Sequence, residues 1–187
     1  MTIYIIRHGA AEPNLRKCFL GSTDAPLAPE SRALLSGRRY PPAARVAVSP
    51  MKRCLETAEI IYGGGYAVYP DLREIDFGEF ENRSHPELLR EHPFYQTWLD
   101  SGGVLTPPGA EPLEDFRRRT CRCFLQAVAD TERFPLAIVA HGGTIKALTD
   151  AYLDAGEEFY FWSVKNGGGI ECDWDGERLR LTGRLFD

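Results

Sequence analysis

Two histidines of the 187-residue sequence follow short apolar runs, at points where a ligand site is expected. His8 follows the run 2–6, and His141 follows the run 136–140 and precedes a predicted helix. In open parallel sheets, ligands bind where strands end and loops lead into helices. A glycine directly after each histidine lets the backbone approach a ligand closely, and the N–H groups of a helix N-terminus attract anions. One histidine at such a place is more often a core or capping residue, so it is the occurrence of two that indicates a ligand site.

Two arginines accompany these histidines. Arg7 directly precedes His8, and Arg53 lies near the start of a predicted helix after the apolar run 46–48. An arginine on a helix is usually a solvated charge, but one in the first turn opposes the helix dipole and favours an anionic partner. Because a guanidinium group binds phosphate through two hydrogen bonds at once, these residues indicate a site for a small phosphate-bearing ligand.

The elements that must position these residues alternate between strands and helices. Apolar, β-branched runs are typical of buried strands in parallel sheets, and they occur at 2–6, 46–48, 66–69 and 136–140. Apolar residues at three- and four-residue intervals predict helices over 51–62, 113–129 and 144–153. The alternation predicts an α/β fold, specifically a three-layer α/β/α sandwich with a mostly parallel sheet and helices on both faces.

The C-terminal part and one long insertion depart from this alternation. Strand-like runs occur at 159–164, 170–174 and 179–182, and the Asp175-Gly176 pair is a hairpin signal, so the sheet is expected to finish with antiparallel edge strands. Between about 76 and 112, proline and glycine pairs separate short helical pieces. We interpret this stretch as a lid-like insertion within a single domain spanning 1–187.

Composition narrows the class of ligand. The net charge is −5 and the basic residues are scattered, which argues against a nucleic-acid partner and suits a small anionic substrate. The five cysteines contain no CxxC pair, which argues against a disulfide framework and a zinc site. No window approaches membrane-spanning length and no signal peptide is recognised, so we expect a cytoplasmic protein that binds no membrane. No ligand spacing implies a metal, and no cofactor is expected.

Taken in order, these motifs resemble those of the histidine phosphatase superfamily, which includes cofactor-dependent phosphoglycerate mutases and α-ribazole phosphatases. The resemblance covers almost the whole chain, and its ordered set of motifs is far more specific than the Arg-His-Gly triplet alone. The motifs are Arg7-His8-Gly9 with Glu12 and Asn14, Gly21-Ser22, Pro26-Leu27, Ser49-Pro50 with Arg53 and Glu56-Thr57-Ala58, the run 72–78, Pro108-Gly109-Ala110-Glu111, and Ala140-His141-Gly142-Gly143.

The resemblance implies that His8 attacks phosphorus and becomes a phosphohistidine, while Arg7, Arg53 and His141 hold the phosphoryl oxygens. Physical chemistry agrees, because nucleophilic attack requires an unprotonated His8 and neighbouring arginines lower the pKa of a histidine. One carboxyl group can protonate the leaving alkoxide and then activate water. Glu74 matches the family position of that proton donor, and Glu81 is its main rival.

Further residues are assigned to the phosphate pocket by the same resemblance. Asn14 and the Gly21-Ser22 turn are expected to line it, and Gly142 is expected at the helix N-terminus after His141. For Glu111, two roles are considered, organising the pocket from behind or capping the helix that follows it, and we favour the capping role.

Three activities are compatible with these residues. We favour a phosphomonoesterase that hydrolyses a small phosphate ester, because the chain is short for a mutase of this family and its 76–112 stretch has few basic residues, chiefly Arg83 and Arg90, to bind the second anionic group of a mutase substrate. The run 72–81 is especially similar to that of α-ribazole phosphatases, which makes α-ribazole 5'-phosphate one candidate substrate. The alternatives are a phosphoglycerate mutase-type phosphotransferase and a catalytically silent phosphate-binding or interaction module.

Overall fold

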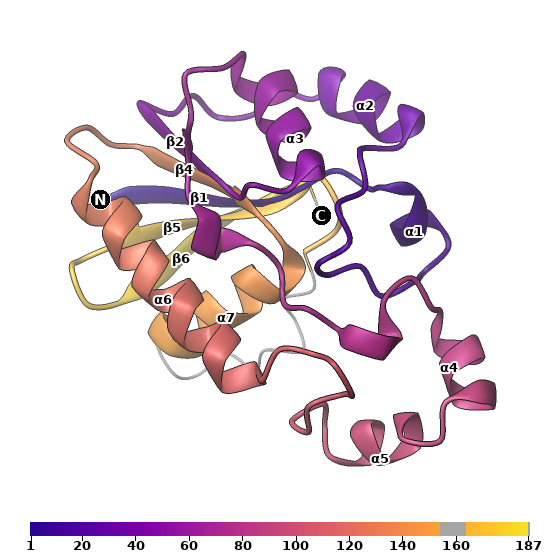
Figure 1. The fold of residues 1–187 in the computed structure, drawn as a ribbon. Coiled ribbons are helices and arrows are strands. Elements are labelled where there is room, and N and C mark those ends of the chain that lie inside the picture. The colour runs from indigo at the N-terminus through magenta and orange to yellow at the C-terminus, as the bar shows by residue number, and fades with distance from the viewer. Residues whose placement is uncertain (154–163, 187) are drawn as a thin grey trace.

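A mixed sheet forms the centre of the computed structural model, which describes residues 1–153 and 164–186 (Figure 1). Its six strands lie in the order β3-β2-β4-β1-β5-β6. Their bounds are β1 (Thr2–Arg7), β2 (Arg45–Val48), β3 (Ala67–Val68), β4 (Leu136–Ala140), β5 (Gly169–Trp174) and β6 (Leu179–Leu185). The pairings among β3, β2, β4 and β1 are parallel, whereas β5 pairs antiparallel with both β1 and β6. The predicted sheet with antiparallel edge strands is therefore confirmed.

Helices cover both faces of this sheet. Those in the described residues are α1 (Glu12–Leu15), α2 (Pro29–Ser36), α3 (Lys52–Tyr62), α4 (His85–Glu91), α5 (Tyr95–Asp100), α6 (Leu113–Ala129) and α7 (Gly142–Tyr152). In Figure 1, α2 and α3 lie above the sheet and α6 and α7 lie below it. The three-layer α/β/α prediction is confirmed. The strand-like run predicted at 159–164 lies outside the described residues except for Val164.

Alternation along the central strands explains why the sheet has a helix layer on each side. Ile5 of β1 belongs to a buried cluster with Phe124 of α6 and Leu148 of α7. The next residue, Ile6, points the other way and belongs to a second cluster with Ala58 of α3. Because successive side chains of a strand face opposite sides, a run that is apolar throughout requires a cover on both.

The segment 76–112, which we call the α4–α5 segment, has a buried cluster of its own. Phe80, Leu88 and Tyr95 are buried in it, and Phe77 and Trp98 pack against them. These aromatic side chains thus pack mainly against one another. In Figure 1, α4 and α5 lie away from the two helix layers, past the ends of the parallel strands.

The two ends of the α4–α5 segment are joined by backbone hydrogen bonds. The Glu111 amide donates to the Asp76 carbonyl, and the Glu79 amide donates to the Pro108 carbonyl, each at 3.0 Å. Gly78 lies between them with a φ of +56°, and a Cβ on it would be 2.2 Å from the Pro108 carbonyl oxygen. Only glycine fits this close approach, so the segment leaves the sheet through a narrow, fixed neck.

None of the helices in residues 1–153 and 164–186 has the length and apolar character needed to cross a bilayer.

Candidate active site

The register between β1 and β4 places the two predicted histidines side by side. Arg7 of β1 is paired with Ala140 of β4, so His8 and His141 are the next residues of two neighbouring parallel strands. Their rings lie edge to face with centroids 5.1 Å apart. The two strand ends therefore bring these histidines into contact.

His8 is held in a single tautomer. Its Nδ1 lies 2.6 Å from the Gly9 carbonyl oxygen, which can only accept a hydrogen bond, so Nδ1 carries the proton and Nε2 carries the free lone pair. Burial lowers the pKa of His8 well below its usual range, and the charges of Arg53 and Arg7 lower it further. Sequence reasoning attributed this shift to the arginines, but desolvation is the larger cause. His8 is therefore neutral at neutral pH.

Arg53 is completely buried at the start of α3. Its two terminal nitrogens donate to the carbonyls of Thr23 and Gly21, each at 2.8 Å. Its buried Nε has no hydrogen-bond partner among the described residues. Burial lowers the pKa of Arg53, although a guanidinium still keeps its charge at neutral pH. A buried N–H without an acceptor costs free energy, so this group requires a partner from outside the described chain.

Arg7, the residue before His8, shows a similar arrangement. One of its terminal nitrogens donates to the Val164 carbonyl at 2.8 Å, and its buried Nε likewise lacks a partner in the described part of the chain. Burial lowers the pKa of Arg7, and the nearby charge of Glu74 raises it. The site thus contains two guanidinium groups, each with a buried Nε–H donor that lacks an acceptor among the described residues.

His141 is fully buried, and its Nε2 lies 2.7 Å from the Ser49 hydroxyl. Burial lowers the pKa of His141 well below its usual range, and the proximity of His8 adds to this shift. The Cys54 thiol lies 3.5 Å from the same Nε2, and burial raises the pKa of that thiol to about 12, which keeps it protonated. The imidazole rings of both histidines are therefore neutral.

Glu74 faces the same site from the strand end beyond β3. Its Oε2 accepts from the Gly143 amide at 3.0 Å, and its Oε1 accepts from the Ile75 amide at 3.1 Å. Burial raises the pKa of Glu74 above its usual value, while the two amides and the charge of Arg53 oppose the rise. A buried carboxyl group with a raised pKa is suited to both giving and taking a proton.

An ion pair behind Glu74 fixes the backbone at that residue. Arg119 of α6 binds both carboxylate oxygens of Glu111 at 2.6 Å. The same guanidinium donates to the carbonyls of Asp71, Arg73 and Glu74 at 2.7 to 3.0 Å. Glu111 therefore contacts the Glu74 backbone only through Arg119. The sequence favoured helix capping for Glu111, but α6 has no side-chain cap hydrogen bond among the described residues.

Glu81, the rival proton donor, is occupied elsewhere. Its carboxylate accepts hydrogen bonds from the amides of Gly21, Ser22, Thr23 and Phe77 and from the Thr23 hydroxyl, at 2.7 to 3.3 Å. The amides of Gly21 and Ser22, expected to line the phosphate pocket, are thus directed at Glu81. Gly21 contributes to the site indirectly, because its carbonyl and that of Thr23 in the same turn hold Arg53.

A cavity of about 360 Å³, which we call the catalytic cavity, opens over part of this constellation. Its lining includes Arg7, Asn14, Glu74 and Gly142. The Asn14 side chain also accepts from the Ala11 amide at 3.0 Å, which fixes its orientation. Buried Arg53, His8 and His141 are outside this lining, and His8 keeps an exposed fraction of 3%.

Two contributors were missed from the sequence. Arg119 lies in an Arg117-Arg118-Arg119 run that resembles a solvated helix face. Only its helical position separates it from half-buried Arg117 and exposed Arg118. Asn166 donates from Nδ2 to the His8 carbonyl at 3.1 Å, and the Gly167 amide donates to the same oxygen at 3.0 Å. The glycine run after Asn166 was visible but carried no indication of this contact.

Comparisons with known proteins show which proteins this chain is similar to. A family model described as the histidine phosphatase superfamily (branch 1) matches residues 3–184. A candidate phosphoserine phosphatase of Hydrogenobacter thermophilus is 30% identical over 96% of this chain and 93% of its own. The adenosylcobalamin/α-ribazole phosphatase of Salmonella typhimurium is 28% identical over 79% of this chain and 77% of its own.

Solved structures extend the similarity to three dimensions. A phosphoglycerate mutase from Thermus thermophilus has a TM-score of 0.75 and 31% identity, covering all of this chain and 99% of its own. The α-ribazole phosphatase from Shigella flexneri has a TM-score of 0.84, covering all of this chain and 96% of its own, but at 21% identity it shows the shared fold alone.

The free energy of unfolding should fall steeply as the pH drops below about 6.5. His8 and His141 then bind protons in the unfolded chain but stay neutral in the folded protein, where they are buried. Each histidine contributes a slope approaching about 1.4 kcal/mol per pH unit. Glu74, whose pKa is raised, acts in the opposite sense below its folded-state pKa. Urea unfolding between pH 7.5 and 5.5 measures the change of the unfolding free energy with pH. His8→Ala should lower this slope by nearly the contribution of one bound proton. Equal slopes in the two proteins would contradict a neutral His8.

Proposed function

Because the chain belongs to the histidine phosphatase superfamily, we propose that it is a phosphomonoesterase that hydrolyses a small phosphorylated metabolite through a phosphohistidine at His8. The observation that carries this proposal is the pair of buried guanidinium groups of Arg7 and Arg53, each with an Nε that lacks a partner among the described residues. A phosphoryl group beside His8 supplies the acceptor oxygens and the negative charge that both groups require. His141, Asn14 and the helix N-terminus at Gly142 complete the phosphate pocket.

The first half-reaction forms a nitrogen–phosphorus bond. The lone pair of His8 Nε2 attacks phosphorus, and the bond between phosphorus and the ester oxygen breaks. The charge that develops on the phosphoryl oxygens is stabilised by Arg7 and Arg53, which is the main task of a phosphoryl-transfer site. Glu74 gives its proton to the leaving oxygen, so the alcohol departs neutral.

The second half-reaction reverses these roles. The Glu74 carboxylate takes a proton from water, and the water oxygen attacks phosphorus. The nitrogen–phosphorus bond breaks and its electron pair returns to His8 Nε2, so inorganic phosphate leaves and both residues regain their starting states. The raised pKa of Glu74 supports this cycle, because the carboxyl group must be protonated in one step and ionised in the next.

Water is the favoured acceptor, in preference to a second phosphorylated substrate. Arg83 and Arg90, the main basic residues of the α4–α5 segment, both form ion pairs with Glu91. Neither is therefore available as a dedicated clamp for the additional anionic group that a mutase substrate carries. This supports hydrolysis over phosphoryl transfer to another metabolite.

Among possible substrates, α-ribazole 5'-phosphate is the first to test, since relatives in Salmonella typhimurium and Escherichia coli are named for that activity. Phosphoserine is the second, because the relative in Hydrogenobacter thermophilus is a candidate phosphoserine phosphatase. We place the reaction in the cytoplasm, where the five cysteines, all free in the structure, would stay reduced. The arginines supply the positive charge for which other phosphatases use a metal ion.

The variant His8→Ala should lose at least about a thousandfold in hydrolysis of an aryl phosphate, because no nucleophile remains. Rapid quenching of the wild type should trap a phosphoprotein that is labile to acid and stable to base, as expected of phosphohistidine. His85→Ala, which changes a histidine of α4, serves as the control and should keep both properties. Equal activity in wild type and His8→Ala would refute the mechanism, and phosphate binding without activity in either would establish a silent module.

Glu74→Gln should slow the hydrolysis of an alkyl phosphate much more than the phosphorylation of His8 by a nitrophenyl phosphate, because nitrophenolate leaves without a proton. We expect a loss of roughly 100- to 1,000-fold for the alkyl ester. Burst kinetics with the nitrophenyl ester separate phosphorylation from the later attack by water. Glu79→Gln, at a largely exposed carboxylate, is the matched control. An equal loss on both esters in the burst phase would argue against Glu74 as the proton donor.

Arg119→Lys tests the positioning role of the Glu111 ion pair. Lysine keeps the charge but loses the fork that holds Glu111 and three carbonyls together, so Glu74 should be displaced. We expect kcat for an alkyl phosphate to fall roughly tenfold with little change in KM, and the loss to depend on the leaving group as it does in Glu74→Gln. Arg118→Lys, at an exposed arginine of the same helix, is the control. A loss of thermal stability with unchanged leaving-group dependence would show a structural role only.

A further inference from the structure

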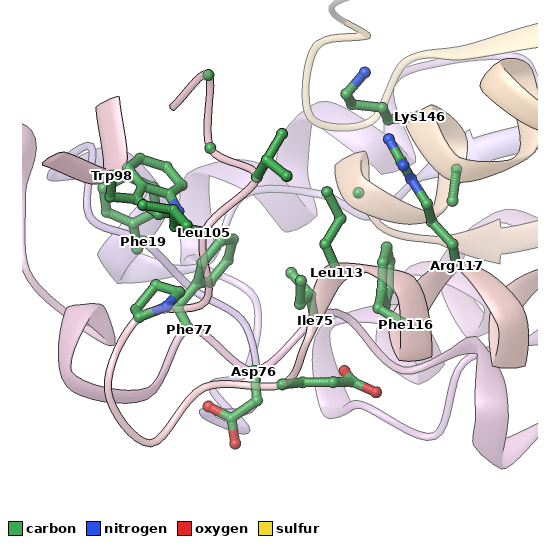
Figure 2. Close-up of a pocket in the computed structure, with 17 residues that line it drawn as sticks. Phe19, Ile75, Asp76, Phe77, Trp98, Leu105, Leu113, Phe116, Arg117 and Lys146 are labelled. Atoms are coloured by element: carbon green, nitrogen blue, oxygen red, sulfur yellow. The ribbon is translucent and has the colours of Figure 1, made fainter. Parts of the chain in front are cut away.

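A second cavity adjoins the catalytic cavity. It has a volume of about 420 Å³ and lies between the α4–α5 segment and helices α6 and α7 (Figure 2). We call it the side pocket. Four residues line both cavities: Phe19, Phe77, Gly143 and Lys146. The two cavities are therefore neighbouring compartments of one cleft.

Glu74 lies where the two compartments meet. The amide of Gly143, a residue that lines both, donates to Glu74 Oε2 at 3.0 Å. A Cβ on Gly143 would lie only 2.3 Å from Glu74 Oε1, so the carboxylate is in close contact with this shared wall. The oxygen of a leaving alcohol must reach Glu74, and an alcohol held there has the side pocket directly beyond it.

The walls of the side pocket are largely apolar and come from two directions. Figure 2 shows Phe19, Phe77, Trp98 and Leu105 gathered on one side. Ile75, Leu113 and Phe116 lie between this group and the basic side chains of α6 and α7. A space of this size between aromatic and aliphatic walls fits a planar ring system, and it is far larger than a seryl or glyceryl group requires.

The charged residues of the side pocket are already engaged. Arg117 and Lys146 lie together at one side of it in Figure 2, and both pair with Asp150 of α7. Glu111 is bound by Arg119, and Asp76 accepts from the Gly78 amide at 2.8 Å. An alcohol bearing its own carboxylate or ammonium group would have to compete with these partners, whereas an apolar one would not.

We propose that the side pocket binds the alcohol half of the phosphate ester, and that this alcohol carries a bulky, apolar ring system. This inference rests on the proposed phosphomonoesterase activity and specifies its substrate class. It ranks ring-bearing esters above phosphoserine and phosphoglycerate. The ring occupies the space between Phe116 and the aromatic side chains of Phe19, Phe77 and Trp98. The ester oxygen then lies at Glu74, and the phosphoryl group lies against His8.

Two esters of primary alcohols with similar intrinsic reactivity, naphthylethyl phosphate and ethyl phosphate, separate ring binding from leaving-group chemistry. The wild type should hydrolyse the naphthylethyl ester with a kcat/KM roughly 10- to 100-fold higher, which is the discrimination expected from burying one ring system. A ratio near one would overturn the proposal.

Leu105→Glu places a carboxylate on the wall of the side pocket. Leu105 is 43% exposed, so the change should not disturb folding. We expect it to lower the naphthylethyl to ethyl ratio by roughly tenfold, because a desolvated charge opposes ring binding. Leu89→Glu, at a leucine of α4 that is 51% exposed and lines neither cavity, is the matched control and should keep the ratio. A ratio that stays unchanged in Leu105→Glu would overturn the proposal.

Binding of naphthylethanol itself, followed by NMR, distinguishes the two levels of inference. If neither ester is hydrolysed, the proposed function fails. In that case, alcohol binding that Leu105→Glu weakens and Leu89→Glu does not would still support the side pocket, and absence of binding would overturn it. If both esters are hydrolysed at equal rates, the side pocket assignment fails and the phosphatase activity stands.

Discussion

The guanidinium group of Arg53 keeps its charge although it is completely buried, and an ion removed from water is tolerated only where protein groups replace its hydration. The carbonyls of Gly21 and Thr23 supply two of the replacements. They point at Arg53 because Glu81 binds the amides of the same turn from the opposite side. The buried charge thus depends on a carboxylate at the root of the α4–α5 segment, and the phosphate site and this segment are held by one set of hydrogen bonds.

Sheet topology then decides which groups meet. The strand order β3-β2-β4-β1 brings the segments that follow these strands to one edge, and they carry Glu74, Arg53, His141 and His8 respectively. Each segment contributes at least one of the groups proposed to act in the reaction. The ion pair of buried Arg119 with partly buried Glu111 holds the most distant of them, Glu74, through its backbone. The site is therefore built from strand ends and fixed from behind by two partly buried carboxylates, Glu81 and Glu111.

Much of this arrangement is predictable from local patterns. Apolar runs identify the parallel strands, and the rule that ligands bind at their carboxyl ends brings His8 and His141 together without further information. Arg119 was missed, and Glu81 was considered only as a proton donor, because the roles of both depend on long-range contacts. An arginine in a basic run or a glutamate in a polar stretch has the same local sequence whether it is solvated or held inside the protein. The cause of the low His8 pKa was also misjudged, since burial cannot be read from neighbouring charges.

The narrow neck at Asp76 and Glu111 separates two sets of residues with different proposed tasks. All the groups proposed to act on phosphate come from outside it, whereas Trp98 and Leu105, which form part of the side pocket wall, come from within. Sequence changes in the α4–α5 segment, natural or engineered, can therefore alter which alcohol is bound. The residues proposed to act on phosphate stay unchanged. A single scaffold of this kind can acquire new substrates by exchanging one loop, provided that the exchange keeps Glu81.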